Sequence, residues 1–329
     1  MAAEPTLLEI SHVKKYFPRK KPTFRQSQEW LKAVDDVSLT IPRFYSVGLV
    51  GESGCGKSTL GRTILRLHAP TGGRVVFEGQ PLFDMEGKQW LPEARMRDLR
   101  KDMQMIFQDP YGSLNPRLTV GQAVEEGVAR HHVVPAADRR AYCEEILENC
   151  GLEKKFYMAY PHEFSGGQRQ RIVIARALAL KPKFVVCDEP TAALDVSIQS
   201  QILNLMMDLR EELNLTYLFI SHNLRVTQAF CDEIVVMYLG KIIEQGPAEE
   251  VCSHPVHPYT QALINSLPVS NPWETKPKAQ ILGSIPSAVH IPSGCRFHPR
   301  CPYATPRCQE DEPAWKDIGG GHCAACHLI

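Results

Sequence analysis

The amino-acid sequence predicts an α/β fold in which a parallel sheet is covered by crossover helices. From Leu7 to about Leu267, short apolar or β-branched runs alternate with longer segments whose apolar residues recur three and four positions apart. This alternation is typical of strands joined by helices. A glycine-rich loop between one such run and the helical segment after it is a second indication. Beyond residue 267 prolines are frequent and the periodicity fades, so we expect the α/β part to end there.

Several short runs have the composition of buried strands, being rich in valine, isoleucine, phenylalanine and tyrosine. Helical spacing occurs between them, as in KSTLGRTILRLH (57–68) and AYCEEILENCGL (141–152). The sequence therefore predicts strands at residues 45–50, 74–79, 103–107, 183–188, 216–221 and 233–238.

Composition excludes several classes of protein. The chain of 329 residues carries 37 basic and 37 acidic side chains, so it lacks the long-range attraction of a dedicated nucleic-acid binder. We expect no nucleic-acid partner. The apolar run at residues 172–180 is much shorter than a membrane span and contains Arg176. The N-terminus lacks the basic region of a secretory signal, so we expect the chain in the cytosol.

GESGCGKST (51–59) follows a predicted strand and opens a predicted helix, which is the context that a phosphate-binding loop requires. Its glycines allow successive backbone N–H groups and the helix N-terminus to surround a triphosphate. Lys57 would reach the β- and γ-phosphates, and the Ser58 hydroxyl would bind Mg²⁺. The sequence thus predicts an ATP site formed by Gly51, Glu52, Ser53, Gly54, Cys55, Gly56, Lys57, Ser58 and Thr59.

FVVCDE (184–189) is a buried-strand pattern that ends in two acids. Carboxylates at the C-terminal edge of a parallel sheet lie beside the phosphate loop in nucleotide-binding folds. We predict that Asp188 is the Mg²⁺ partner. Glu189 would orient or deprotonate the attacking water.

Three further motifs, FSGGQRQR (164–171), TAALD (191–195) and ISH (220–222), identify a family. With the phosphate loop and the acidic strand end, they resemble the motifs of ABC ATPases. The resemblance implies an ABC nucleotide-binding domain at residues 1–267, with a RecA-like core and a helical subdomain at about 119–165. It also implies that a second cassette's nucleotide is contacted by the signature residues Ser165, Gly166, Gly167 and Gln168.

The same resemblance assigns roles to single residues. Gln108 matches the glutamine that contacts Mg²⁺ and leads into the region touching the membrane subunits. His222 matches the histidine that holds the γ-phosphate, with a buried structural histidine as the alternative. Asp195 matches the aspartate that crosses the dimer interface. Phe17 best matches the aromatic residue that stacks on adenine, and Tyr16 is one position away.

PYGSLNPR (110–117) and HPVHPYTQALINSLP (254–268) resemble the dipeptide, oligopeptide and nickel group of ABC importers, and the chain is more similar to the F-like subunit type. The resemblance implies peptide uptake with a homologous ATPase subunit as heterodimer partner, two transmembrane permease subunits and an extracytoplasmic peptide-binding protein. It places the chain peripherally on the cytoplasmic face of the inner membrane. Alternatives are import of nickel or another solute, a soluble ABC ATPase of DNA repair or translation, and a scaffold subunit with an inactive ATP site.

A proline-rich linker is predicted at residues 268–294, followed by a cysteine-rich tail at 295–329. Such a short, loop-rich segment builds little core and needs another source of order. Disulfides are disfavoured in the cytosol, which leaves a four-thiolate metal site or unligated thiols. Zn²⁺ and a [4Fe–4S] cluster are both open on this reasoning. The candidate ligands are Cys295, Cys301, Cys308 and Cys326.

The family resemblance implies a [4Fe–4S] cluster at these four positions, with Cys323 as an additional cysteine. We expect the nearby His298, His322 and His327 to be solvated rather than to replace a ligand.

Overall fold

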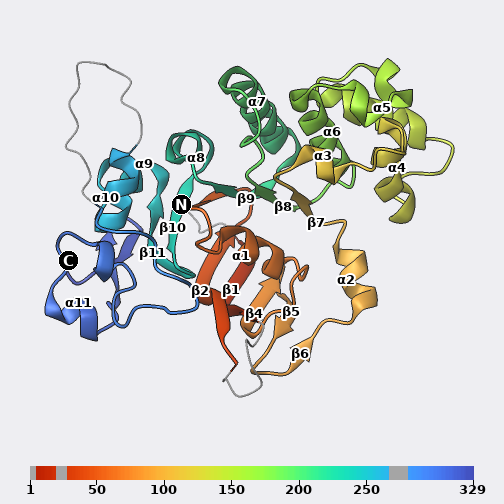
Figure 1. The fold of residues 1–329 in the computed structure, drawn as a ribbon. Coiled ribbons are helices and arrows are strands. Elements are labelled where there is room, and N and C mark those ends of the chain that lie inside the picture. Colours follow the sequence, from red (N-terminus) through yellow and green to blue (C-terminus); the bar gives the residue numbers. More distant parts are fainter. Residues whose placement is uncertain (1–4, 20–27, 267–280) are drawn as a thin grey trace. The chain divides into compact units, whose positions relative to one another are not determined.

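A computed structural model describes residues 5–19, 28–266 and 281–329, so much of the predicted linker lies outside the described residues. The chain divides into unit 1, Met1–Trp90 with Ser221–Ile329, and unit 2, Leu91–Ile220 (Figure 1). None of the helices within those described ranges is long and apolar enough to cross a membrane. The predicted α/β class is confirmed, and strands form at all six predicted places, as β3, β4, β7, β8, β9 and β10.

An antiparallel sheet, which no sequence pattern predicts, forms the first part of unit 1. Its strand order is β2-β1-β4-β5-β6. A two-residue turn joins β4 to β5, and both turn residues, Glu78 and Gly79, have positive φ. Such a turn produces an antiparallel hairpin, so residues 74–79 do not enter a parallel sheet. The bounds are β1 Thr6–Pro18, β2 Trp30–Pro42, β4 Gly72–Phe77, β5 Gln80–Asp84 and β6 Gln89–Trp90.

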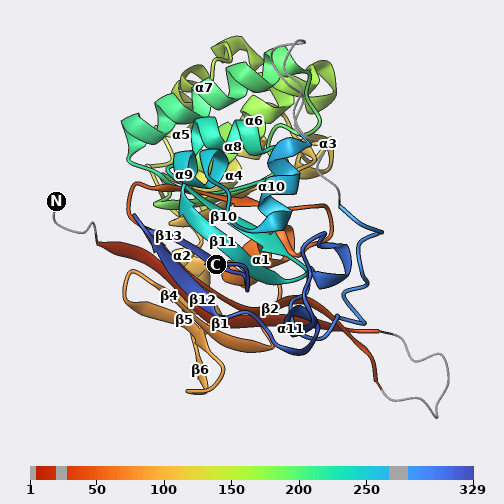
Figure 2. The ribbon, with the colours of Figure 1, turned by 90° about the vertical axis from the view of Figure 1, so that its left-hand side faces the viewer.

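A second set of strands in unit 1 carries the phosphate loop. β3 (Ser46–Val50) is fully buried and pairs parallel with β10 (Glu233–Tyr238). β11 (Lys241–Pro247) pairs antiparallel with β10 and also with β13 (His322–Ala325). β12 (Trp315–Gly319) completes this edge (Figure 2). Part of the predicted small cysteine-rich tail domain, residues 315–325, therefore pairs with the strands of unit 1.

The helices of unit 1 are short. They are α1 (Lys57–Ile64), α8 (Leu224–Phe230), α9 (Ala248–Ser253), α10 (Pro258–Asn265) and α11 (Pro306–Glu310), with a 3-10 turn at His298–Arg300.

An aromatic cluster anchors the tail to unit 1. Phe297 packs against Tyr238 and Tyr259 with ring centroids 5.3 and 5.4 Å apart, and all three side chains are fully buried. Cys295 and Cys301 pack against the same cluster. The sequence predicts metal ligation as the main source of order in the tail. This packing shows that apolar burial also holds it.

Phe297→Ala is accordingly expected to lower the free energy of unfolding by about 3–5 kcal/mol, because it leaves a cavity among buried rings. Chemical denaturation of the metal-free chain measures this loss. The matched control is Trp315→Ala, since Trp315 is a tail aromatic that is 46% exposed. Equal losses in both variants would contradict the anchoring role of Phe297.

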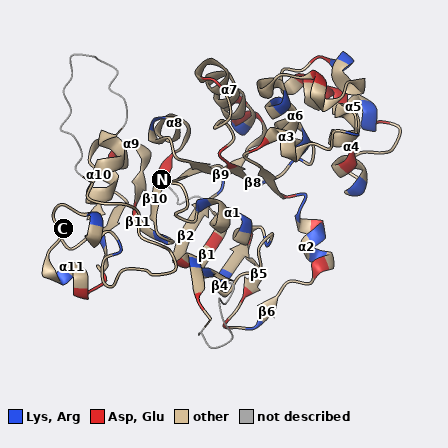
Figure 3. Cartoon of the chain, in the orientation of Figure 1, with Lys and Arg blue, Asp and Glu red and all other residues tan. Residues whose placement is uncertain are grey.

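Unit 2 combines three parallel strands with a helical segment. β8 (Phe184–Asp188) lies between β7 (Met103–Ile106) and β9 (Thr216–Ser221). Both charge signs are interspersed on α2 (Glu93–Leu99) and α5 (Arg139–Asn149) (Figure 3), in keeping with the zero net charge. The helices are α2 Glu93–Leu99, α3 Pro110–Ser113, α4 Val120–Arg130, α5 Arg139–Asn149, α6 Gly166–Leu178 and α7 Val196–Leu213, with 3-10 turns at Lys154–Met158 and Pro161–Glu163.

Candidate functional site

The loop between β3 and α1 has a backbone that only glycine permits at two points. A Cβ on Gly51 would lie 2.2 Å from the Met237 carbonyl oxygen, and one on Gly56 would lie 2.0 Å from the Ala33 carbonyl oxygen. Gly56 also has a φ of 110° and begins α1 as its N-cap. The loop is therefore pressed closely against the neighbouring backbone, with a helix N-terminus at its end, which is favourable for an anion.

Lys57 lies within this loop. Its side chain is buried, and its Nζ donates to the carbonyl oxygens of Gly51, at 2.7 Å, and Glu52, at 3.1 Å. An ammonium held by the loop's own carbonyls is placed to meet phosphate oxygens. Cys55 is buried beside it, and this burial raises the pKa of the Cys55 thiol. The donor set of the loop fits a triphosphate.

The acidic end of β8 forms a polar group within unit 2. Asp188 ends the strand and is fully buried. Glu189 follows with a φ of 47° and accepts a hydrogen bond from Gln108 Nε2 at 3.0 Å. Parallel pairing of β7 with β8 brings these side chains together, because Gln108 lies just beyond the end of β7. Carboxylate and amide oxygens suit Mg²⁺.

The signature residues begin α6. Ser165 is the N-cap and accepts from the Gln168 N–H at 3.4 Å, while the Gln168 side chain accepts from the Ser165 N–H at 3.0 Å. This is a capping box. Gly167 is needed because a Cβ there would meet the Ile198 side chain at 2.5 Å. Ser165 itself is exposed, as a contact with a second chain requires.

Asp195 caps α7, where its carboxylate accepts from the Ile198 N–H at 3.0 Å and the Ser197 hydroxyl at 2.8 Å. The hydrogen bond from Ile198, followed by that from Ser197, lowers the pKa of Asp195. The carboxylate is exposed, and Val196 beside it is 79% exposed. The structure thus gives Asp195 a local capping role within the chain.

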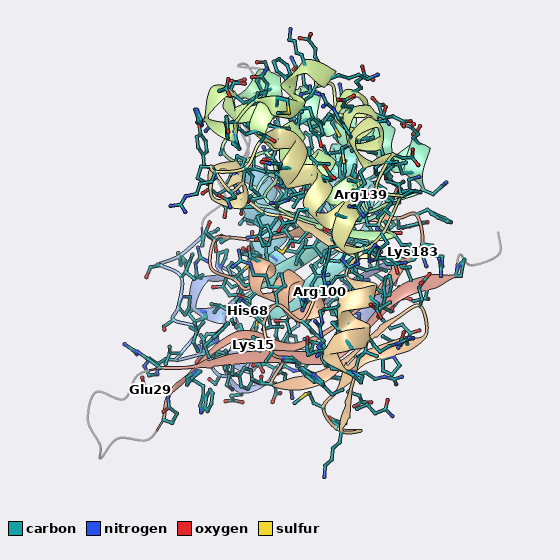
Figure 4. The ribbon with its side chains drawn as sticks, turned by 90° about the vertical axis from the view of Figure 1, so that its right-hand side faces the viewer. Lys15, Glu29, His68, Arg100, Arg139 and Lys183 are labelled. Carbon is teal, nitrogen blue, oxygen red and sulfur yellow. The ribbon has the colours of Figure 1, made fainter. Side chains whose placement is uncertain are left out.

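His222 follows β9 and is exposed, so the alternative of a buried structural histidine does not apply. Phe17 lies near the end of β1, with the Lys15 ammonium 4.5 Å from its ring centroid and the His68 ring 5.5 Å away (Figure 4). The Tyr16 hydroxyl instead donates to Asp35.

The four predicted cysteine ligands lie close enough to act on one another. Burial and, after it, the other three thiols raise the pKa of Cys295 to about 11. Backbone N–H groups donate to three of the sulfurs, from Phe297 to Cys295, from Tyr303 to Cys301 and from Leu328 to Cys326.

Cys323 belongs to a different environment. Cys323 lies in β13, where its strand partners are Asp317 in β12 and Gln245 in β11. Burial and the charges of Asp317 and Glu233 raise the pKa of its thiol.

Within residues 5–19, 28–266 and 281–329, no three His, Cys, Asp or Glu side chains are grouped so as to hold a metal ion.

The expectation of solvated histidines is wrong for His322. Its ring is buried, and its Nε2 lies 2.8 Å from the fully buried carboxylate of Glu244. His298 Nδ1 lies 2.9 Å from the Cys295 carbonyl oxygen, and His327 Nε2 lies 3.0 Å from that of Asp311. The strand pairing of β13 with β11 buries His322, and no local pattern announces that pairing.

Sequence reasoning missed two residues that contact the phosphate loop. Arg300 donates to both carboxylate oxygens of Glu52, at 2.6 and 2.9 Å. Tyr259 Oη accepts from the Glu52 N–H at 2.8 Å. These partners are more than 200 positions away along the chain, so only the tertiary fold reveals them.

Comparison with known proteins decides the family. Residues 34–192 match a family model described as ABC transporter, and residues 243–308 match one described as the C-terminal region of oligopeptide/dipeptide transporters. The oligopeptide transport ATP-binding protein AppF of Bacillus subtilis is 47% identical, over 99% of this chain and 98% of its own length. The chain belongs to the ABC transporter ATP-binding proteins.

Other relatives of this ABC ATPase support the same family assignment. The dipeptide transport ATP-binding protein DppF of Escherichia coli is 43% identical, over 98% of this chain and 94% of its own. Among solved structures, cbiO1 from Clostridium perfringens, part of an ABC transporter complex, has a TM-score of 0.64 at 27% identity, over 76% of this chain and 92% of that one. A dimeric ATP-binding cassette bound to ADP and Pi has a TM-score of 0.64 at 28% identity, over 74% and 99%.

Proposed function

We propose that this ABC ATPase binds Mg·ATP in a head-to-tail dimer with a related ATPase subunit and hydrolyses it to drive uptake of dipeptides or oligopeptides. The solute would arrive on an extracytoplasmic peptide-binding protein and pass through two transmembrane permease subunits, with the chain bound peripherally at the cytoplasmic face of the inner membrane. The observation that carries the proposal is the glycine-built loop around Lys57. AppF and DppF are named for oligopeptide and dipeptide transport, and these names supply the solute class.

Binding of the nucleotide rests on groups that the structure describes. Lys57 would exchange the loop carbonyls for phosphate oxygens, and Ser58 would offer its hydroxyl to Mg²⁺. Asp188 and Gln108 are the other residues that we propose as Mg²⁺ ligands. Bound Mg²⁺ would neutralise part of the charge that develops on the phosphates. Phe17, half-buried beside His68, offers its ring to adenine.

Hydrolysis needs a group that orients water, and Glu189 is that group in this proposal. The Gln108 amide donates to its carboxylate and so restricts its orientation. A carboxylate held in one position acts as a general base more effectively than a mobile one. His222 would hold the γ-phosphate.

Dimerisation would use the exposed signature surface. Ser165, Gly166, Gly167 and Gln168 begin a helix whose N-terminus favours an anion, and Asp195 lies exposed at the start of α7. Closure of two such cassettes would then move the permease subunits between inward- and outward-facing states.

Co-purification under mild detergent conditions tests the assembly. We expect the chain to bring with it two hydrophobic permeases and a second cassette, and ATP hydrolysis to rise when peptide-loaded binding protein is added. A chain recovered only with ribosomes or DNA would instead favour the alternative of a soluble ABC ATPase. The match of residues 243–308 to the peptide-transporter region already disfavours that alternative.

We further propose that Cys295, Cys301, Cys308 and Cys326 hold a [4Fe–4S] cluster, with Zn²⁺ as the alternative. Four thiols and backbone N–H groups that donate to three of the sulfurs are a donor set of the kind that holds iron–sulfur clusters. Burial raises the pKa of Cys295, Cys301 and Cys326, so binding of the metal would have to displace their protons. The cysteine sulfurs around a [4Fe–4S] cluster lie farther apart than those around a single Zn²⁺ ion, because iron and sulfide atoms lie between them.

Protein purified without oxygen is expected to contain iron and acid-labile sulfide. Cys301→Ser or Cys308→Ser should bleach the broad visible absorption and make residues after Gly294 protease-sensitive. Cys323→Ser is the matched control and should change neither property, because Cys323 lies on β13 with other partners. Stoichiometric zinc without iron would refute the cluster, and freely alkylated thiols would refute any metal.

A further inference from the structure

Glu52, in the phosphate loop, is held by the C-terminal tail. Both terminal nitrogens of Arg300 donate to its carboxylate, one to each oxygen, at 2.6 and 2.9 Å. A bidentate guanidinium–carboxylate pair fixes the orientation of both groups. The Arg300 side chain is 7% exposed and that of Glu52 24%, so water screens the pair only partly.

The backbone of Glu52 is held as well. Its N–H donates to Tyr259 Oη at 2.8 Å, and Tyr259 packs against Tyr238 with ring centroids 4.7 Å apart. Because that N–H already has a partner inside the protein, Glu52 has no backbone donor to offer a phosphate. The motif predicts Glu52 as a nucleotide-binding residue, and its contacts instead suit a residue that shapes the loop.

Two sequence features beyond the cassette motifs thus converge on one loop residue. Tyr259 belongs to the HPVHPYTQALINSLP segment on α10, and Arg300 lies in the cysteine-rich tail directly before Cys301. The carboxylate of Glu52 is only five positions before Lys57. An uncompensated negative charge at that place would repel a triphosphate.

We propose that Arg300 is a positioning residue for the nucleotide site: it fixes the phosphate loop through Glu52 and neutralises the carboxylate that would otherwise oppose ATP. The inference rests on the proposed nucleotide site. It makes ATP affinity depend on the tail, although no tail residue touches the nucleotide in this account.

A second tail arginine provides a useful comparison. Arg296 donates to Asp35 and to the Leu239 carbonyl oxygen. It ties the tail to β2 and to the turn after β10 without contacting a side chain of the phosphate loop. Arg296 thus fixes the tail, and Arg300 connects the tail to the loop.

The test is the dissociation constant of a fluorescent ATP analogue, measured on the full-length chain, with thermal melting as the check on folding. Arg300→Met is expected to raise this constant at least about fivefold, the lower end of typical coupling between sites. Arg300→Lys keeps the charge but loses the bidentate geometry, and should have a smaller effect. Arg307→Met is the matched control, because Arg307 is an exposed tail arginine that forms its ion pair with the exposed Asp311.

The double variant separates charge neutralisation from simple loss of packing. Adding Glu52→Gln to Arg300→Met removes the uncompensated carboxylate and should recover most of the lost affinity. A double variant as weak as Arg300→Met, or an Arg300→Met variant that binds as tightly as Arg307→Met, would overturn the inference.

Failure of the proposed function is distinguishable from failure of this inference. Lys57→Ala, measured in the same titration, must lose binding if the loop is a nucleotide site. Weak binding in Lys57→Ala with unchanged binding in Arg300→Met would refute the positioning role alone.

Discussion

Glu189→Gln is expected to bind ATP normally and to lose at least about 100-fold in turnover, the usual scale for a positioned base. The amide keeps the shape of the side chain, and its oxygen still accepts the hydrogen bond from Gln108. The variant loses the negative charge that orients and deprotonates water. Phosphate release by the purified assembly measures turnover, and nucleotide binding by the same sample shows whether affinity is unchanged.

Such a variant should also accumulate as a closed dimer in ATP, which size-exclusion chromatography detects. Glu249→Gln is the matched control, since Glu249 is an exposed glutamate in the first turn of α9. It should keep wild-type turnover. Turnover of the Glu189→Gln assembly at the wild-type rate would remove Glu189 from the catalytic role.

Lys57→Ala is expected to weaken ATP binding by about 100-fold or more, because it deletes a buried charge that meets the phosphates. The effect falls on affinity, in contrast to that of Glu189→Gln. Titration of the isolated chain with a fluorescent ATP analogue measures it. Melting in the absence of nucleotide serves as the folding control, since Lys57 Nζ also bonds to two loop carbonyls.

Ser165→Arg provides the contrast. It should leave ATP binding by the isolated chain intact and block dimer closure, because Ser165 is proposed to serve the partner's nucleotide. Loss of the N-cap of α6 would cost only about 1 kcal/mol of stability. Equal loss of binding in Ser165→Arg and Lys57→Ala would contradict a role in trans for the signature residues.

Much of the fold could be predicted because its signals are local. The strand before the phosphate loop, residues 45–50, and the acidic strand, residues 183–188, are continuous apolar runs, as parallel buried strands usually are. The helix starting at Lys57 follows directly from the glycine-rich loop. In each case the evidence lies within about ten neighbouring residues.

The antiparallel strands β1 and β2 were harder to predict. Their pairing contains several register shifts, one of them between Ile10 and Val13, where His12 has a φ of 50°. Each shift breaks the alternation of buried and exposed residues on which strand prediction depends. The tail strands β12 and β13 are short, and three glycines lie at 319–321. Their place in the sheet depends on pairing with β11, distant in sequence.

In the candidate site, too, residues in local motifs could be predicted and long-range contacts could not. Motif spacing predicted Lys57, Gln108 and Glu189, and the structure brings Gln108 and Glu189 into contact as parallel pairing requires. The contact of Glu52 with Arg300 joins residues 248 positions apart, and both side chains are ordinary surface types in sequence. Long-range ion pairs of this kind leave no periodic or local signature.

The most direct test of the central claim is ATP-dependent peptide accumulation by the complete transporter. The assembly is reconstituted in liposomes so that the cassettes have access to added Mg·ATP and the binding protein with labelled peptide is on the opposite side. We predict uptake that requires ATP and is abolished by Glu189→Gln in this chain. This result requires that the partner cassette cannot sustain transport alone. The same substitution in the partner cassette tests that condition. Sustained ATP hydrolysis by this chain without peptide movement, for every peptide length that the binding protein accepts, would contradict the account.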